Sequence, residues 1–310
     1  MRLVIASGKG GTGKTTVATS LALSLAAQQA FEPSNGREPG LLFLDCDVEA
    51  PNAHLFLKPV FEQQRAAGLL IPEVNEGQCT FCGRCAEVCQ FHAMAVIGQK
   101  LLLFPELCHG CGSCSLTCPE QAISEKPRVM GVLEAGPAAA GIYLAQGTLN
   151  IGEPMAVPLI RQLKQWQHSP PDGHPWGSAH IPVDWPTVIL DAPPGTSCPV
   201  VETMRGADFA LLVTEPTPFG LHDLRLMVEV VRELNLPAGV IINRDGVGEA
   251  AVDQFCVEVG LPVLMRIPLE REIGEGLARG EPLVTIRPDY AVRFRELYQH
   301  IQAMASEVAR

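Results

Sequence analysis

A glycine-rich loop near the start of the chain restricts the fold more than any other feature of the sequence. Residues 8–15 read GKGGTGKT and fit the pattern G-x-x-x-x-G-K-[ST]. The apolar run 2–6 before the loop predicts a buried strand, and the apolar-periodic stretch 14–29 after it predicts a helix. In this context glycines let backbone N–H groups converge on phosphate oxygens at the positive end of a helix. The residues predicted to bind ATP are Gly8, Gly10, Gly11, Thr12, Gly13, Lys14, Thr15 and Thr16.

The last two residues of this loop are expected to bind phosphate and Mg²⁺. Lys14 would reach the β- and γ-phosphates, and the Thr15 hydroxyl would be a ligand of Mg²⁺. The alternative is an ordinary glycine turn, which the flanking strand and helix disfavour.

Other apolar runs predict further buried strands and the fold class. A sheet whose strands are apolar throughout, separated by helices, is mostly parallel and covered on both faces, so the sequence predicts an α/β fold of the P-loop NTPase type. Ligands of such sheets bind at the C-terminal ends of the strands. The predicted strands are 41–45, 187–191, 209–215, 238–244 and 262–268, and the predicted helices begin near 160 and span 222–235, 249–259, 270–279 and 290–309.

Composition excludes several classes of function. The chain has 310 residues, of which 47% are hydrophobic, and a net charge of -11. The acidic balance argues against binding of nucleic acid or of an anionic membrane through charge. The sequence shows neither a signal-peptide pattern nor an apolar run long enough to cross a bilayer, so a cytoplasmic location is expected.

Eleven cysteines are present, and eight of them fall between Cys79 and Cys118. Clustering of this kind in a cytoplasmic chain indicates a metal site rather than disulfides. The segment has two copies of one pattern, CTFCGRCAEVCQ and CHGCGSCSLTCP, so it is expected to be an internally repeated module inserted at 68–127 between two parts of the ATPase domain, 1–67 and 128–310. The remaining thiols Cys46 and Cys256 are predicted to be core residues.

Both runs fit the spacing of bacterial ferredoxins with two [4Fe–4S] clusters. In that pattern three cysteines of a run converge on one cluster, and the fourth crosses to the other. Zinc is the alternative, but zinc sites usually have two separated CxxC pairs. Gln90 stands where a proline is usual after the first run. The predicted ligand sets are Cys79, Cys82, Cys85 and Cys118 for one cluster, and Cys108, Cys111, Cys114 and Cys89 for the other.

The string KGGTGKTT resembles the deviant Walker A motif of the MinD/ParA/nitrogenase-iron-protein group. That resemblance implies a dimer that encloses ATP, either a homodimer or a heterodimer with a paralogue, in which Lys9 contacts the partner's nucleotide. It also implies that Asp47 activates the attacking water and that Asp45 and Asp191 lie near Mg²⁺. By the same resemblance Asn243 contacts adenine, with a second contact near Pro268.

Two features depart from relatives in this group. Cys198 follows Asp191 where the nitrogenase iron protein has a cluster-bridging cysteine, but no second such cysteine is evident, and a buried or structural thiol is the alternative. The C-terminal helix mixes Glu with Arg and His, so it is expected to dock on protein rather than on a membrane.

Nearly the whole chain resembles MinD-superfamily ATPases with a ferredoxin insert. The resemblance implies ATP hydrolysis coupled to electron transfer through two [4Fe–4S] clusters, with a redox or Fe–S protein as partner. Two alternatives remain open: an Fe–S cluster carrier or scaffold, and an ATP-dependent assembly or positioning module.

Overall fold

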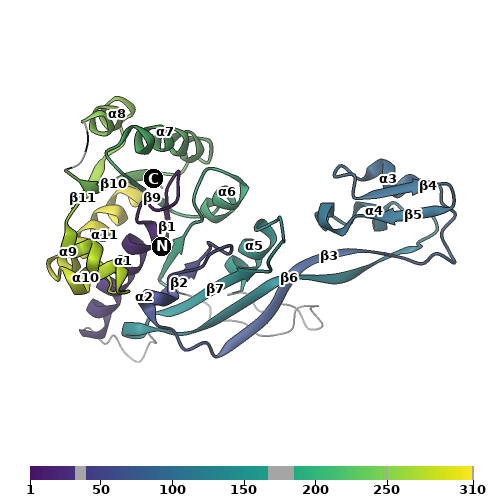
Figure 1. Ribbon diagram of the computed structural model, residues 1–310, viewed down its shortest axis with the longest axis horizontal. Coiled ribbons are helices and arrows are strands. Elements are labelled where there is room, and N and C mark those ends of the chain that lie inside the picture. Colours follow the sequence, from purple (N-terminus) through teal and green to yellow (C-terminus); the bar gives the residue numbers. More distant parts are fainter. Residues whose placement is uncertain (32–39, 167–184, 247, 249, 309–310) are drawn as a thin grey trace.

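Figure 1 shows the chain, a computed structural model, as a layered body from which a slender extension projects. The structure describes residues 1–31, 40–166, 185–246, 248 and 250–308. Surface loops that composition predicts at 31–40 and 168–186 lie almost entirely outside the described residues.

The centre of the body is a sheet that has nine strands in the described part of the chain, in the order β11-β10-β9-β1-β8-β2-β7-β6-β3. From β11 to β7 neighbouring strands are parallel, whereas β6 and β3 are antiparallel at one edge. The prediction of a mostly parallel α/β sheet is therefore confirmed. The parallel strands are β1 (Arg2–Ala6), β2 (Leu41–Asp45), β7 (Tyr143–Leu149), β8 (Thr187–Asp191), β9 (Phe209–Thr214), β10 (Ala238–Asp245) and β11 (Val263–Pro268).

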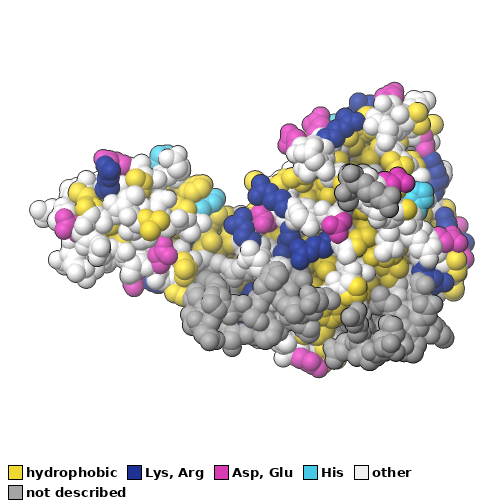
Figure 2. All heavy atoms as spheres, turned by 180° about the vertical axis from the view of Figure 1, so that it is seen from behind, with side chains coloured by type: hydrophobic (Ala, Val, Ile, Leu, Met, Phe, Trp, Pro, Cys, Tyr) yellow, Lys and Arg dark blue, Asp and Glu magenta, His cyan; other side chains and the backbone are white. Residues whose placement is uncertain are grey.

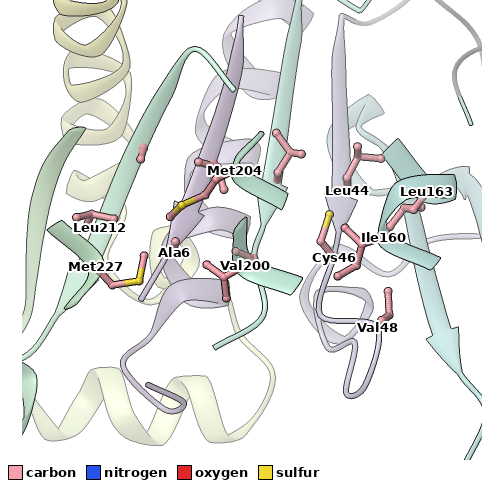
Figure 3. Packing of buried hydrophobic residues seen from close by; sticks show 14 of the residues in the cluster. Ala6, Leu44, Cys46, Val48, Ile160, Leu163, Val200, Met204, Leu212 and Met227 are labelled. Atoms are coloured by element: carbon pink, nitrogen blue, oxygen red, sulfur yellow. The ribbon is translucent and has the colours of Figure 1, made fainter. Parts of the chain in front are cut away.

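Helices cover both faces of this sheet, and each face has its own apolar core. Figure 3 shows part of one core, where Ile160 and Leu163 of α5 lie near Cys46 and Val48. Cys46 and Cys256 are both buried in that core, as predicted. The helices are α1 (Lys14–Phe31), α2 (His54–Leu57), α5 (Val157–Gln165), α6 (Cys198–Met204), α7 (Pro218–Glu233), α8 (Ala251–Val259), α9 (Arg271–Ala278), α10 (Leu283–Ile286) and α11 (Asp289–Val308).

The start of α7 lies earlier than the predicted 222 because of a local capping signal. Pro218 occupies the first turn, and the Thr217 hydroxyl accepts a hydrogen bond from the Gly220 N–H at 3.0 Å. Such a cap satisfies an N–H that the helix itself leaves unpaired.

The C-terminal helix α11 packs on the body. Its apolar residues Tyr290, Phe294 and Ile301 are buried in the core that α1 also lines. In the described part of the chain, no helix has the combination of length and apolarity that a membrane span needs.

The antiparallel edge of the sheet is a long ribbon made of β3 (Gln63–Val74) and β6 (Ile123–Pro137). Neither this ribbon nor β7 was predicted from the sequence. Glycine and alanine hide the strand pattern, although the glycines are required by close backbone packing. A Cβ on Gly131, for example, would collide with the carbonyl oxygen of Thr148 on β7.

A β-bulge between Ala67 and Gly68 divides the ribbon into two halves. The inner half pairs with β7, and the outer half extends beyond the body. The predicted insert boundaries, 68 and 127, lie close to this bulge, where both strands continue without a break.

The outer half of the ribbon carries residues 75–122, here called the cysteine lobe. Figure 2 shows it as a separate lobe with apolar side chains on its surface. The exposed apolar residues of the lobe include Leu116, which is 86% exposed. Two small apolar clusters join the lobe to the ribbon through Ile71 and Ile123. Its elements are α3 (Arg84–Val88), β4 (Met94–Ile97), β5 (Lys100–Leu103), η1 (Pro105–Leu107) and α4 (Ser113–Leu116).

Candidate functional site

The phosphate loop connects the end of β1 to the start of α1 at the C-terminal edge of the parallel strands. Gly13 has a φ of +94°, and a Cβ there would collide with the side-chain amide of Asn243. That amide donates a hydrogen bond of 2.7 Å to the carbonyl oxygen of Thr12. Asn243, predicted to contact adenine, therefore also braces the loop from the end of β10. Pro268 ends the neighbouring strand β11, beside Asp245 in the register.

Two buried acids meet at the ends of adjacent strands. Asp45 of β2 and Asp191 of β8 are partners in the parallel register. The Thr15 hydroxyl donates a 2.6 Å hydrogen bond to Oδ2 of Asp191, while Oδ1 of Asp191 is buried without a hydrogen-bond partner among the described residues. A threonine hydroxyl and an orphaned carboxylate oxygen beside a phosphate loop are suitable ligands for Mg²⁺.

Asp45 is used differently. Its carboxylate accepts hydrogen bonds from the backbone N–H groups of Asp47, Asn52 and Ala53, at 3.2, 2.9 and 3.0 Å. It therefore folds the loop that follows β2 and so determines where Asp47 lies.

Burial dominates the electrostatics of these acids. Desolvation, with the negative charge of Asp45 as a second cause, raises the pKa of Asp191 to about 8. Desolvation also raises the pKa of Asp45 to about 6, against hydrogen bonds that lower it. Desolvation raises the pKa of the half-buried Asp47, and the positive charge of Lys14 opposes part of this increase. The side chains of Asp47 and Lys14 therefore face the same site.

Lys9 has a partner within its own chain, which the sequence analysis did not foresee. Its Nζ lies 3.1 Å from Oε2 of Glu215, and Arg244 Nη1 lies 2.6 Å from Oε1 of the same carboxylate. Glu215 is only 8% exposed. The available signal was an acid directly after the buried strand β9, a position that belongs to no phosphate-binding motif.

The eight cysteines of the lobe line two pockets. One pocket is lined by Cys79, Cys82, Cys85 and Cys118. The other is lined by Cys89, Cys108, Cys111 and Cys114. These are the two sets that the spacing predicts, each with one cysteine from the other run. Within the described residues, no three His, Cys, Asp or Glu side chains are arranged to hold a single metal ion.

Cys198 lies at the start of α6 and is exposed, so it is not a buried core thiol. It follows the turn in which the Gly195 N–H donates to the carbonyl oxygen of Ser7 at 3.0 Å. This bond ties the segment after β8 to the phosphate loop.

The family model for the CobQ/CobB/MinD/ParA nucleotide binding domain matches residues 3–283. The chain belongs to this family. A family model that spans most of the chain, together with the phosphate loop and its acids, identifies a MinD/ParA-type ATPase.

Several known proteins are similar to this ATPase over most of its length. An uncharacterized protein of Methanocaldococcus jannaschii is 28% identical over 99% of this chain and 97% of the relative. An iron-sulfur cluster carrier protein of Synechocystis is 24% identical over 93% of this chain and 66% of the relative. Among solved structures, the septum site-determining protein MinD of Pyrococcus horikoshii, complexed with Mg-ADP, has a TM-score of 0.53 at 20% identity and covers 100% of this chain and 98% of its own. This likeness shows a shared fold.

Replacing Asp191 with asparagine should stabilise the nucleotide-free ATPase, and more so as pH rises. Because folding raises the pKa of Asp191 from 3.8 to about 8, its contribution is favourable below the unfolded value and is lost as pH rises through about 8. The asparagine amide would not ionise, so we expect about 1–3 kcal/mol more stability at about pH 9 and a smaller gain at about pH 5. Thermal unfolding without Mg²⁺ measures both.

The matched control is Glu229→Gln, which removes an exposed carboxylate from α7. It should leave the melting temperature unchanged at either pH. An equal gain for Asp191→Asn at both pH values would contradict burial as the cause. The same variant should lose ATP hydrolysis, because the amide is a poorer magnesium ligand than a carboxylate.

Proposed function

We propose that this ATPase couples Mg-ATP hydrolysis to electron transfer through two [4Fe–4S] clusters held in the cysteine lobe. The observation that carries the proposal is the division of eight cysteines into two pockets of four. Thiolates in fours favour Fe–S clusters or zinc, and three closely spaced cysteines plus a distant fourth are typical of two-cluster ferredoxins. When bound, each cluster would supply a one-electron redox centre.

The pockets have surroundings that suit such a group. Apolar side chains line them beside the thiols, among them Val96 and Ile123 in one pocket and Leu70 and Met94 in the other. Desolvation raises the pKa of Cys114 to about 11, so the free thiol would be protonated at neutral pH. Binding of a cluster would therefore release protons from these thiols.

For the hydrolysis step, each residue of the nucleotide site has a proposed role. The loop N–H groups and Lys14 would bind the phosphates, and Thr15 and Asp191 would hold Mg²⁺. Asp47 orients the attacking water. Lys9 of a second subunit, in a homodimer or a heterodimer with a paralogue, would stabilise charge on the γ-phosphate. Because Glu215 holds Lys9 within the chain, Lys9 must exchange this partner when the dimer closes.

The fold offers a connection between the two sites. Asp45 is the register partner of Gln146 on β7, and β7 pairs with β6. Strand β2, which ends in Asp45 just before Asp47, is thus two strands away from β6 of the ribbon that carries the lobe. A change at Asp47 on ATP binding can reach the lobe through this edge of the sheet.

One alternative has a specific observation behind it. The Synechocystis relative is named an iron-sulfur cluster carrier protein, which favours a role in delivering clusters. The division of eight cysteines into two complete sets of four suits retained clusters better than released ones. A third role, positioning of a partner protein according to the ATP state, needs no electron transfer at all.

An anaerobic EPR redox titration of the purified protein, with and without Mg-ATP, tests the proposal. We expect two [4Fe–4S] signals and a nucleotide-dependent change in potential or line shape. Unchanged clusters would contradict ATP-gated electron transfer and favour positioning. Loss of iron on addition of ATP would favour the carrier role.

A further inference from the structure

One side chain bridges the ATPase body and the cysteine lobe. Arg128 lies on β6, just beyond the bulge. Its Nη2 donates to both carboxylate oxygens of Glu153, at 2.8 and 2.7 Å, and its Nη1 donates to the carbonyl oxygen of Pro105 at 3.2 Å. The Arg128 and Glu153 side chains are only 16% and 14% exposed. A single guanidinium therefore joins a body residue to a lobe residue.

Hydrogen bonds connect Glu153 to the nucleotide site. Val48, the residue after Asp47, accepts a 2.8 Å bond from the Leu149 N–H at the end of β7. The next residue, Asn150, donates to the Met130 carbonyl oxygen at 2.8 Å and accepts from the Glu153 N–H at 3.1 Å. The segment that carries Glu153 is thus bonded at one end to the loop that carries Asp47 and Val48.

At its other end the bridge reaches one cysteine pocket. Pro105 begins the short helix η1, and the Cys108 N–H donates to the Pro105 carbonyl oxygen at 3.2 Å. That carbonyl oxygen also accepts the Arg128 bond. The Arg128 guanidinium and the Cys108 backbone N–H thus share one acceptor, which brings the positive charge beside this pocket.

We infer that Arg128 is a positioning residue that transmits the nucleotide state to the pocket of Cys89, Cys108, Cys111 and Cys114. This inference rests on the proposed function. When the loop at Asp47 and Val48 moves, Glu153 moves with Leu149 and Asn150, and Arg128 shifts relative to Cys108. A positive charge favours the reduced, more negative state of a cluster, so its displacement changes the potential of this cluster and not of the distant one.

Buried ion pairs are poor devices for stability, because desolvation offsets most of their attraction. A hydrophobic contact would have stabilised the connection between the cysteine lobe and the ATPase body as well. The Arg128 guanidinium instead holds Glu153 and Pro105 in one relative orientation, because its N–H groups donate to two partners in defined directions.

Three variants separate the effect of the Arg128 charge from that of its hydrogen bonds to Glu153 and Pro105. Arg128→Gln removes both the charge and these bonds, so the potential of the nearby cluster should fall and its shift on adding Mg-ATP should be lost. Arg128→Lys keeps the charge, so it should restore the potential without restoring the full response, because an ammonium cannot form the same fork. Glu153→Gln should lose the response as well. The matched control is Lys126→Gln, which breaks an exposed ion pair with Glu73 on the same ribbon and should change neither property.

EPR redox titration measures the potentials, with iron content and basal ATP hydrolysis expected to stay at the level of the unsubstituted protein. Amide hydrogen exchange at residues 105–110 adds a readout that needs no clusters. Mg-ATP should change protection there, and Glu153→Gln should abolish the change. Equal nucleotide responses in Glu153→Gln and the unsubstituted protein would overturn the inference. If the unsubstituted protein binds no clusters, the proposed function fails, while hydrogen exchange still decides whether the bridge transmits.

Discussion

Lys14→Ala should lower ATP turnover by about 10³-fold or more and leave the iron content unchanged. Lys14 is 7% exposed at the start of α1, and its charge lowers the pKa of both Asp47 and Asp191. Without it, two acids would face the phosphates uncompensated. Removal of a charged group that stabilises a phosphoryl transition state typically costs about 10³–10⁵-fold.

The iron content should survive because the cysteine pockets draw no residue from the phosphate loop. Steady-state phosphate release and iron analysis on the same preparation measure the two effects. Lys58→Ala, at an exposed position after α2, is the control and should change neither. Loss of iron from Lys14→Ala would contradict the view that the ATPase body and the cysteine lobe are separate modules.

Cys118→Ser should remove about half of the iron, corresponding to one of two [4Fe–4S] clusters. Cys118 belongs to the second run but lines the pocket of the first. A serine oxygen is a harder ligand than a thiolate and holds iron in such a cluster less well. Iron analysis and EPR of the reduced protein should show a single remaining cluster.

Double variants decide whether the runs cross. Cys118→Ser combined with Cys79→Ser should lose no more iron than either alone, since both cysteines line one pocket. Cys118→Ser combined with Cys108→Ser should lose nearly all of it. The reverse result would mean that each run holds its own cluster. Cys198→Ser, which replaces an exposed thiol outside the lobe, is the control and should retain all the iron.

The parts of the fold that depend on residues close together in the chain could be predicted from the sequence. The phosphate loop lies between β1 and α1 as expected, and the apolar runs became buried strands because burial on both faces of a parallel sheet requires such runs. The spacing of the cysteines also predicts which of them lie together, and the same two groups of four line the two pockets; their binding of clusters stays a prediction.

The rest depends on contacts between distant residues. The ribbon of β3 and β6 was missed because its glycines serve backbone approach across strands, which no local pattern reveals. Glu215 and Asn243 show the same limit for the site. One pairs with Lys9 and the other braces Thr12, in each case from a strand far along the chain.

The two cysteine pockets lie at different distances from the bulge at Ala67 and Gly68. The outer ribbon from Gly68 to Val74 extends roughly 20 Å beyond the bulge, at about 3.3 Å per residue, so any rotation at the bulge would be largest at the tip. A rotation of about 5° there would carry its tip about 2 Å. The pocket of Cys79 lies at the tip, beside Ile123, and would travel this far, whereas the pocket of Cys108 is lined by Leu70 and Pro72 of the middle of the ribbon and would travel about half as far. Nucleotide exchange would then alter the reach of one pocket and the electrostatics of the other.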